Sequence, residues 1–214
     1  MDELQLKVAE SLLELDLVGF SPDDPVTFKS GIISPVYIDN RQLPFFPQAW
    51  RTIIDGFRQM IDHHQLTFDA IAGIEAAGIP HSAALGYALQ KPSLFVRKQV
   101  KTHGMGKQVE GGDVRAKRVL LVEDLVTTGS SSLNGVAALR EAGAIVTDCL
   151  AITSYGLTAT AQAFTDAQVQ LHILAPFSTV LQAGMRVGRF SQQDSQIIET
   201  WLRDPHGWAV EQGT

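Results

Sequence analysis

The feature that most limits how this chain can fold is the alternation, between residues 68 and 174, of short apolar segments with segments of helical periodicity. Uninterrupted apolar runs are typical of strands that are buried on both faces. Strands that alternate with helices run parallel, because each helix returns the chain to the same end of the sheet. The sequence therefore predicts an α/β fold with a doubly wound parallel sheet. The expected strands are 68–74, 93–96, 119–122, 145–153 and 169–174, and the helices expected between them are 79–89, 131–142 and 158–166.

The first third of the chain has a different pattern. Leucine and valine recur at helical spacing over residues 2–18, and a second apolar stripe covers residues 53–61, so both segments are expected to be helices. Between them, prolines divide residues 20–47 into short pieces, of which 26–28 and 36–38 read as strands. This composition indicates a small irregular subdomain. We interpret residues 1–214 as a single domain that consists of this subdomain, a core over about 48–180, and a C-terminal helix and tail over 190–214.

Composition excludes several classes of function. The chain has 17 Lys and Arg residues against 23 Asp and Glu residues, a net charge of −6. This balance argues against nucleic acids and anionic membranes as partners. No apolar run approaches the roughly 20 residues that a membrane-spanning helix needs. The single cysteine, Cys149, cannot form an internal disulfide and points to a reducing compartment. We therefore expect a cytoplasmic protein without nucleic-acid or membrane partners.

The segment 119–131, VLLVEDLVTTGSS, combines the features of a phosphate and sugar site. A buried strand ends at two adjacent carboxylates, Glu123 and Asp124, which can accept hydrogen bonds from sugar hydroxyls. A turn rich in hydroxyl groups then enters a helix, whose free N–H groups and positive dipole end favour an anion. Gly129 lets the backbone approach that anion closely. The alternative, a strand followed by an ordinary N-cap, does not explain the paired acids.

Basic residues are concentrated in one place, although the chain is acidic. Residues 97–118 hold seven of the 17 basic side chains, and they begin with the sequence RKQVKTHG. A loop that carries Arg97, Lys98, Lys101 and His103 could close over a diphosphate, stabilise its charge as it leaves, and exclude water. On charge alone, a solvated basic loop is an equal alternative.

These segments resemble the type I phosphoribosyltransferases. Residues 119–131 are similar to the family signature for 5-phosphoribosyl 1-diphosphate (PRPP). Residues 97–104 resemble the flexible catalytic loop of orotate phosphoribosyltransferases, and KSGIISPVY at 29–37 resembles the hood of those enzymes. We use the name hood for residues 20–47. The turn at 73–79, GIEAAGI, occupies the place of the diphosphate-binding loop, where the family often has a cis peptide bond; here the bond would be Glu75–Ala76 or Ala76–Ala77.

The resemblance implies that PRPP and orotate react to give orotidine 5′-monophosphate and diphosphate. It implies Mg²⁺, held mainly by the ligand, and a homodimer in which the basic loop of one subunit reaches the active site of the other. Orotate contacts are implied for Thr127, Lys29, Tyr37 and Ile38. Catalytic roles are implied for Lys101, Asp124, Lys29 and His103. The implied PRPP contacts are Arg97, Lys98, Lys101, His103, Glu123, Asp124, Leu125, Val126, Thr127, Thr128, Gly129, Ser130, Ser131, Glu75, Ala76 and Ala77.

The sequence departs from the family pattern at two positions. Some orotate enzymes have a lysine at the place of Ala77, and some have an arginine that binds the orotate carboxylate at about the place of Tyr155. Tyrosine can donate a hydrogen bond but carries no charge, so this role is not assigned to Tyr155. Two other functions stay open: the same reaction with adenine or another pyrimidine, and a regulator that binds PRPP without catalysis.

Overall fold

The computed structural model describes residues 2–98 and 108–211. Its centre is a six-stranded sheet in the order β10-β9-β8-β5-β6-β7. All neighbouring strands in it are parallel except β7, which pairs antiparallel with β6. The predicted fold class is therefore confirmed, with an antiparallel edge strand that the apolar pattern did not indicate. The strands are β5 (Ala70–Ile74), β6 (Ser93–Val96), β7 (Val109–Glu110), β8 (Val119–Val126), β9 (Asp148–Ser154) and β10 (Gln170–Pro176).

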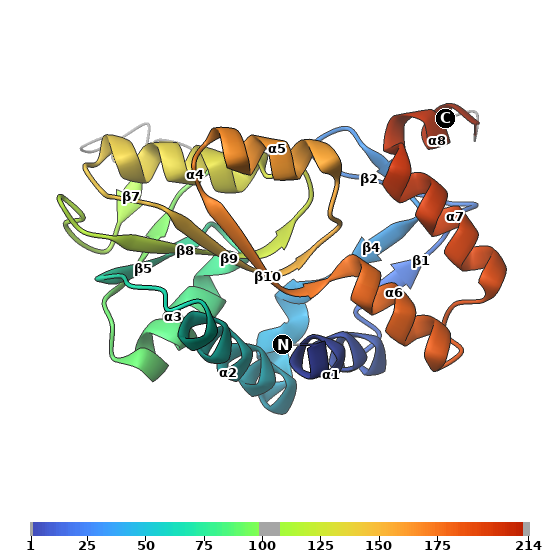
Figure 1. Cartoon of the computed structure of the whole chain (residues 1–214), viewed down its shortest axis with the longest axis horizontal. Coiled ribbons are helices and arrows are strands. Elements are labelled where there is room, and N and C mark those ends of the chain that lie inside the picture. Colours follow the sequence, from blue (N-terminus) through green and yellow to red (C-terminus); the bar gives the residue numbers. More distant parts are fainter. Residues whose placement is uncertain (1, 99–107, 212–214) are drawn as a thin grey trace.

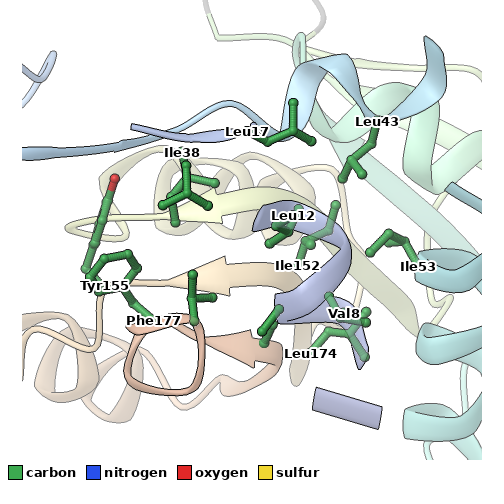
Figure 2. Packing of buried hydrophobic residues seen from close by; sticks show 14 of the residues in the cluster. Val8, Leu12, Leu17, Ile38, Leu43, Ile53, Ile152, Tyr155, Leu174 and Phe177 are labelled. Atoms are coloured by element: carbon green, nitrogen blue, oxygen red, sulfur yellow. The ribbon is translucent and has the colours of Figure 1, made fainter. Parts of the chain in front are cut away.

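Helices cover both faces of the sheet, as a doubly wound fold requires. Figure 1 shows α4 (Ser130–Glu141) and α5 (Thr158–Asp166) on one face, with α1 (Asp2–Glu14), α2 (Pro47–His63) and α3 (Gly78–Leu89) on the other. Each face has its own apolar core. The larger core extends from the sheet into α1 and the hood, as the labelled side chains in Figure 2 show.

The hood consists of two short antiparallel pairs and a 3-10 helix. Strand β1 (Val18–Phe20) pairs with β4 (Val36–Ile38), and β2 (Val26–Thr27) pairs with β3 (Ile33–Ser34). The 3-10 helix η1 (Asn40–Phe45) then leads directly into α2. Asn40 in η1 is completely buried, so this polar residue belongs to the junction between the hood and the sheet.

Several predicted boundaries are wrong. The first helix ends at Glu14, because Asp16 adopts a positive φ of 57° and residues 18–20 form β1. The strand predicted at 119–122 continues to Val126, since its polar end keeps pairing with β9 as far as Val126 and Ser154. The strand predicted at 145–153 begins only at Asp148.

After β10, the chain forms α6 (Phe177–Arg186), α7 (Gln192–Arg203) and α8 (Pro205–Glu211). A capping box starts α7: Asp194 N donates to Ser191 Oγ, and Ser191 N donates to the Asp194 carboxylate. Trp201 of α7 is completely buried, and its Nε1 donates to the carbonyl oxygen of Ile33 at 2.8 Å. The C-terminal helices thus pack against the hood. None of the described helices is both long and apolar enough to span a membrane.

Candidate active site

A cavity of about 310 Å³ lies where the hood meets the carboxyl end of β8. Its hood side is formed by Phe28, Lys29 and Ser30, and its other side by the end of β8 and the first turn of α4, residues 125–132. The carboxyl edge of a parallel sheet is where doubly wound folds bind ligands. The cavity therefore brings together two segments that the sequence separates by about a hundred residues.

The turn at residues 127–131 leads into the first turn of α4. Gly129 is the N-cap, with φ of 79° and no side chain of its own to cap the helix. Thr160 Oγ1 donates to the carbonyl oxygen of Thr127 at 2.6 Å, and the hydroxyls of Thr128 and Ser130 are 3.0 Å apart. The hydroxyls and the free helix N–H groups suit a phosphate.

The two carboxylates behave differently from one another. Glu123 is 5% exposed and accepts from Ser132 Oγ at 3.5 Å, so it lies beneath the first turn of α4. Burial, and secondly the charge of Asp124, raise the pKa of Glu123 well above its usual range. Burial also raises the pKa of Asp124, although Asp124 is less buried and has a favourable electrostatic contact with Arg41 of the hood. Asp124 is thus the more accessible acid of the pair.

Asn40 is a residue of the site that the sequence analysis missed. Its Nδ2 donates to the carbonyl oxygen of Asp124 at 2.7 Å and to Thr153 Oγ1 at 2.8 Å. The amide therefore joins η1 to the ends of β8 and β9. The available signal was a polar residue two positions after the apolar end of β4, inside the hood.

The loop after β5 has the expected backbone form. The Glu75–Ala76 peptide bond is cis, which confirms one of the two bonds expected from the resemblance. Gly78 packs so closely on β8 that a Cβ there would lie 2.5 Å from the carbonyl oxygen of Val122. Glu75 Oε2 accepts from the backbone N–H of Lys98 at 3.0 Å. This bond joins the loop after β5 to the start of the basic segment.

Arg97 lies outside the main cavity. Its guanidinium pairs with Glu110 of β7 at 3.1 Å, and its backbone N–H donates to Gln108 O at 2.9 Å. Arg97 and Lys98 line a neighbouring cavity of about 180 Å³, to which Ser131 also contributes. Lys101 and His103 lie outside the described residues, so the structure does not test their predicted roles.

The hood residues that were expected to contact the orotate base differ in their surroundings. Lys29 lines the cavity. Tyr37 accepts a hydrogen bond from Arg41, but Ile38 is 2% exposed and its side chain points into the core, as Figure 2 shows. The structure does not test the expected contact of Ile38 with orotate, but it shows that the Ile38 side chain is buried. Only its backbone remains available for a base contact.

This fold and this cavity define a phosphoribosyltransferase, and the family model "Phosphoribosyl transferase domain" matches residues 46–155. The chain is 40% identical over 202 residues to an orotate phosphoribosyltransferase of Coxiella burnetii, which covers 94% of this chain and 97% of that protein. It is 39% identical over 201 residues to that of Bacillus caldolyticus, with the same coverage. The crystal structure of orotate phosphoribosyltransferase from Aeropyrum pernix matches with a TM-score of 0.74 and 28% identity, over 86% of this chain and 99% of that one. The chain belongs to the orotate phosphoribosyltransferase family.

Proposed function

We propose that this protein transfers the 5-phosphoribosyl group of PRPP to orotate. The bond between the anomeric carbon and the diphosphate oxygen breaks, and the same carbon bonds to a ring nitrogen of orotate, which loses its proton. The products are orotidine 5′-monophosphate and diphosphate, in pyrimidine biosynthesis. The observation that carries the proposal is the cavity in which the hood residue Lys29 faces the phosphate-binding turn of α4.

The 5′-phosphate binds at residues 127–131 in this proposal. The helix N–H groups and the neighbouring hydroxyls bind this phosphate, which is remote from the reacting carbon of the ribose. Binding energy from this remote group aligns the sugar with the attacking nitrogen. Asp124 holds the ribose hydroxyls and offsets the positive charge that develops on the sugar when the bond to diphosphate breaks. Glu123 supports the binding of the ribose hydroxyls from beneath α4, without a share in the charge, because burial favours its neutral form.

The diphosphate binds at the cis-peptide loop, residues 75–78, beside Lys98. Arg97, Lys98, Lys101 and His103 stabilise the negative charge on the leaving group. Lys29 and Tyr37 contact the base, with Thr127 from the other side of the cavity. The Glu75–Lys98 hydrogen bond supports this arrangement, because it holds the start of the basic segment against the diphosphate loop.

Magnesium is part of the proposal, and the acids of the site fit it. Among residues 2–98 and 108–211, no group of three His, Cys, Asp or Glu side chains could hold a metal ion alone. The site does offer two carboxylates, and Mg²⁺ commonly binds through one or two carboxylates together with substrate phosphates. Asp124 and the oxygens of PRPP would hold it. When bound, Mg²⁺ supplies positive charge to the departing diphosphate.

A cytoplasmic location is also proposed, in keeping with the lone cysteine, Cys149, which is buried in β9.

We further propose a homodimer in which the basic loop of one subunit completes the site of the other. Mixing two inactive variants, Lys101→Ala and Asp124→Asn, tests this arrangement. If the loop acts across the dimer, random pairing makes half of the dimers mixed, and each mixed dimer has one intact site out of two. Activity therefore returns to about a quarter of the wild-type value. If the loop acts within its own subunit, the mixture stays inactive.

Ultraviolet absorbance tests the reaction itself. Orotate loses its characteristic absorbance when it is ribosylated, so the signal of a mixture of protein, orotate, PRPP and Mg²⁺ should fall, and omission of any one component should abolish the change. A constant signal with orotate, together with diphosphate release in the presence of adenine, would contradict the proposal. Tight PRPP binding without turnover of any base would instead favour a regulator.

A further inference from the structure

Lys29 has a special position among the residues that form the main cavity. Of the described residues that line it, only Lys29 carries a positive charge. An acidic base such as orotate brings a carboxylate into this space, and a cation stabilises a carboxylate far better than a neutral donor does. The placement of Lys29 therefore matters for the choice of base.

The backbone of Lys29 is fixed by the residue before it. Phe28 N donates to the carbonyl oxygen of Ile32 at 2.8 Å, and Gly31 N donates to the carbonyl oxygen of Phe28 at 2.9 Å. Gly31 has φ of 84°, a conformation that favours glycine, and it closes the turn. Lys29 and Ser30 thus occupy a tight turn whose two ends meet at Phe28 and Ile32. Any shift of Phe28 shifts Lys29 as well.

Phe28 is held in turn by a cluster of rings. Its ring stacks on Tyr155 with centroids 5.4 Å apart and 26° between the planes. Trp201 meets both rings edge-on, at 5.2 Å from Tyr155 and 6.4 Å from Phe28. Tyr155 also packs on Phe177, with the ring centroids 5.3 Å apart. Figure 2 shows Tyr155 beside Phe177 in the core, and Tyr155 is only 3% exposed.

Trp201 ties this cluster to the C-terminal part of the chain. The residue is completely buried, and its hydrogen bond to Ile33 fixes the strand that follows the Lys29 turn. Helix α7 therefore supports the turn from two directions, through the rings beneath Phe28 and through the backbone of β3. Tyr155, at the end of β9, does not face the cavity and acts as the platform for Phe28.

We propose that the stack of Phe28 on Tyr155, backed by Trp201, is a positioning element that sets Lys29 against the base, so that helix α7 takes part in base recognition. This inference rests on the proposed function, because that function gives Lys29 its role at the base. Phe28, Tyr155 and Trp201 act through Lys29 and are positioning residues.

Phe28→Leu tests the inference, because it keeps an apolar side chain and removes the stacked ring. We expect the KM for orotate to rise about tenfold while the KM for PRPP changes less than about twofold. The matched control is Phe20→Leu, which removes another aromatic contact of the hood, with Phe190 at 6.1 Å, away from the cavity lining. It should leave both KM values within about twofold of the wild type.

A double-mutant cycle with Lys29→Met separates positioning from general packing. If Phe28 acts through Lys29, the Phe28→Leu change costs less than about twofold in kcat/KM once Lys29 is methionine. An equal loss in both backgrounds, or an equal rise in both KM values, overturns the inference. If Phe28→Leu does not fold, Trp201→Phe replaces it in the double-mutant cycle with Lys29→Met. Trp201→Phe keeps an aromatic ring and loses the hydrogen bond to Ile33. If the wild-type protein consumes a base other than orotate, only the proposed function is refuted. The double-mutant cycle is then measured with that base.

Discussion

Asn40 donates a hydrogen bond from its buried side-chain amide to the carbonyl oxygen of Asp124, at 2.7 Å. The same amide also donates to Thr153 Oγ1. A single side chain of η1 therefore holds the hood against the backbone of Asp124, the residue whose carboxylate the proposed mechanism places beside the ribose. Asn40 thus links the hood to the ends of β8 and β9.

Replacing Asn40 should weaken both the fold and the reaction. Asn40→Ala leaves a buried carbonyl and a buried hydroxyl without their donor, so we expect a loss of about 1–3 kcal/mol in the free energy of unfolding. Urea denaturation measures this loss, and kcat/KM should fall as well. The control is Gln42→Ala in the same 3-10 helix, whose exposed amide donates to Asp39; it should cost less than about 0.5 kcal/mol. Equal stability of the two variants would refute the role of Asn40.

The stability of the protein should depend on pH through Glu123. Burial raises the pKa of this carboxyl, so the folded state favours its neutral form and binds a proton more tightly than the unfolded state. The contribution of Glu123 to stability is therefore lost as the pH rises from about 4.5 through the raised pKa. Glu123→Gln cannot ionise, and its melting temperature should exceed that of the wild type by a margin that grows with pH. Parallel melting curves across this range would argue against the buried acid.

His81 should produce the opposite dependence at lower pH. The ring is completely buried and accepts from Trp50 Nε1 at 3.0 Å, and burial lowers its pKa from 6.5 to about 4. The unfolded state then binds more protons between these values, so stability falls as the pH falls from 6.5 to 4, by about 3 kcal/mol in total. His81→Gln keeps an acceptor for Trp50 and cannot titrate, so chemical denaturation across this window should show a smaller slope. An unchanged slope would assign the acid sensitivity to other groups.

Gly129 should not tolerate a side chain. Its φ is 79°, and a Cβ would lie 2.7 Å from the ring of Phe164. Gly129→Ala should therefore cost about 1–3 kcal/mol in stability and raise the KM for PRPP, because the N-cap of α4 would have to move. Gly112→Ala, at a glycine with open space around it, is the control and should be close to wild type in both melting temperature and KM.

Lys101 is expected to act on the leaving diphosphate. Lys101→Ala should lower kcat by about a hundredfold or more and leave the melting temperature unchanged, because the charge is needed only during the reaction. Lys7→Ala, an exposed lysine on α1, serves as the control. Near-normal turnover of Lys101→Ala would remove this residue from the mechanism.

The sequence predicted the sheet and the turn before α4 well, because both depend on local patterns. Apolar runs mark buried strands, and the VEDLVTTGSS segment carries its own turn and helix start. It could not predict that β8 continues through Glu123 and Asp124. Pairing with β9 stabilises that polar end, and this partner lies far away in the chain.

The same reason explains the residues that were missed or misplaced. Asn40 has no local pattern that marks it, since its role depends on Asp124 and Thr153, which η1 meets only in the folded chain. Ile38 alternates with Tyr37 in a short strand, and only the packing of the folded core decides that Ile38 is the buried member of that pair. The Arg97–Glu110 ion pair likewise needs the antiparallel edge formed by β7.

The most direct test of the central claim is a competition among bases for limiting PRPP. The protein is incubated with Mg²⁺, PRPP and equal concentrations of orotate, uracil and adenine, and the nucleotides formed are identified and quantified by mass spectrometry. The account predicts that orotidine 5′-monophosphate forms almost alone and in equal amount to the diphosphate released. Uridine or adenosine monophosphate as the main product would contradict it.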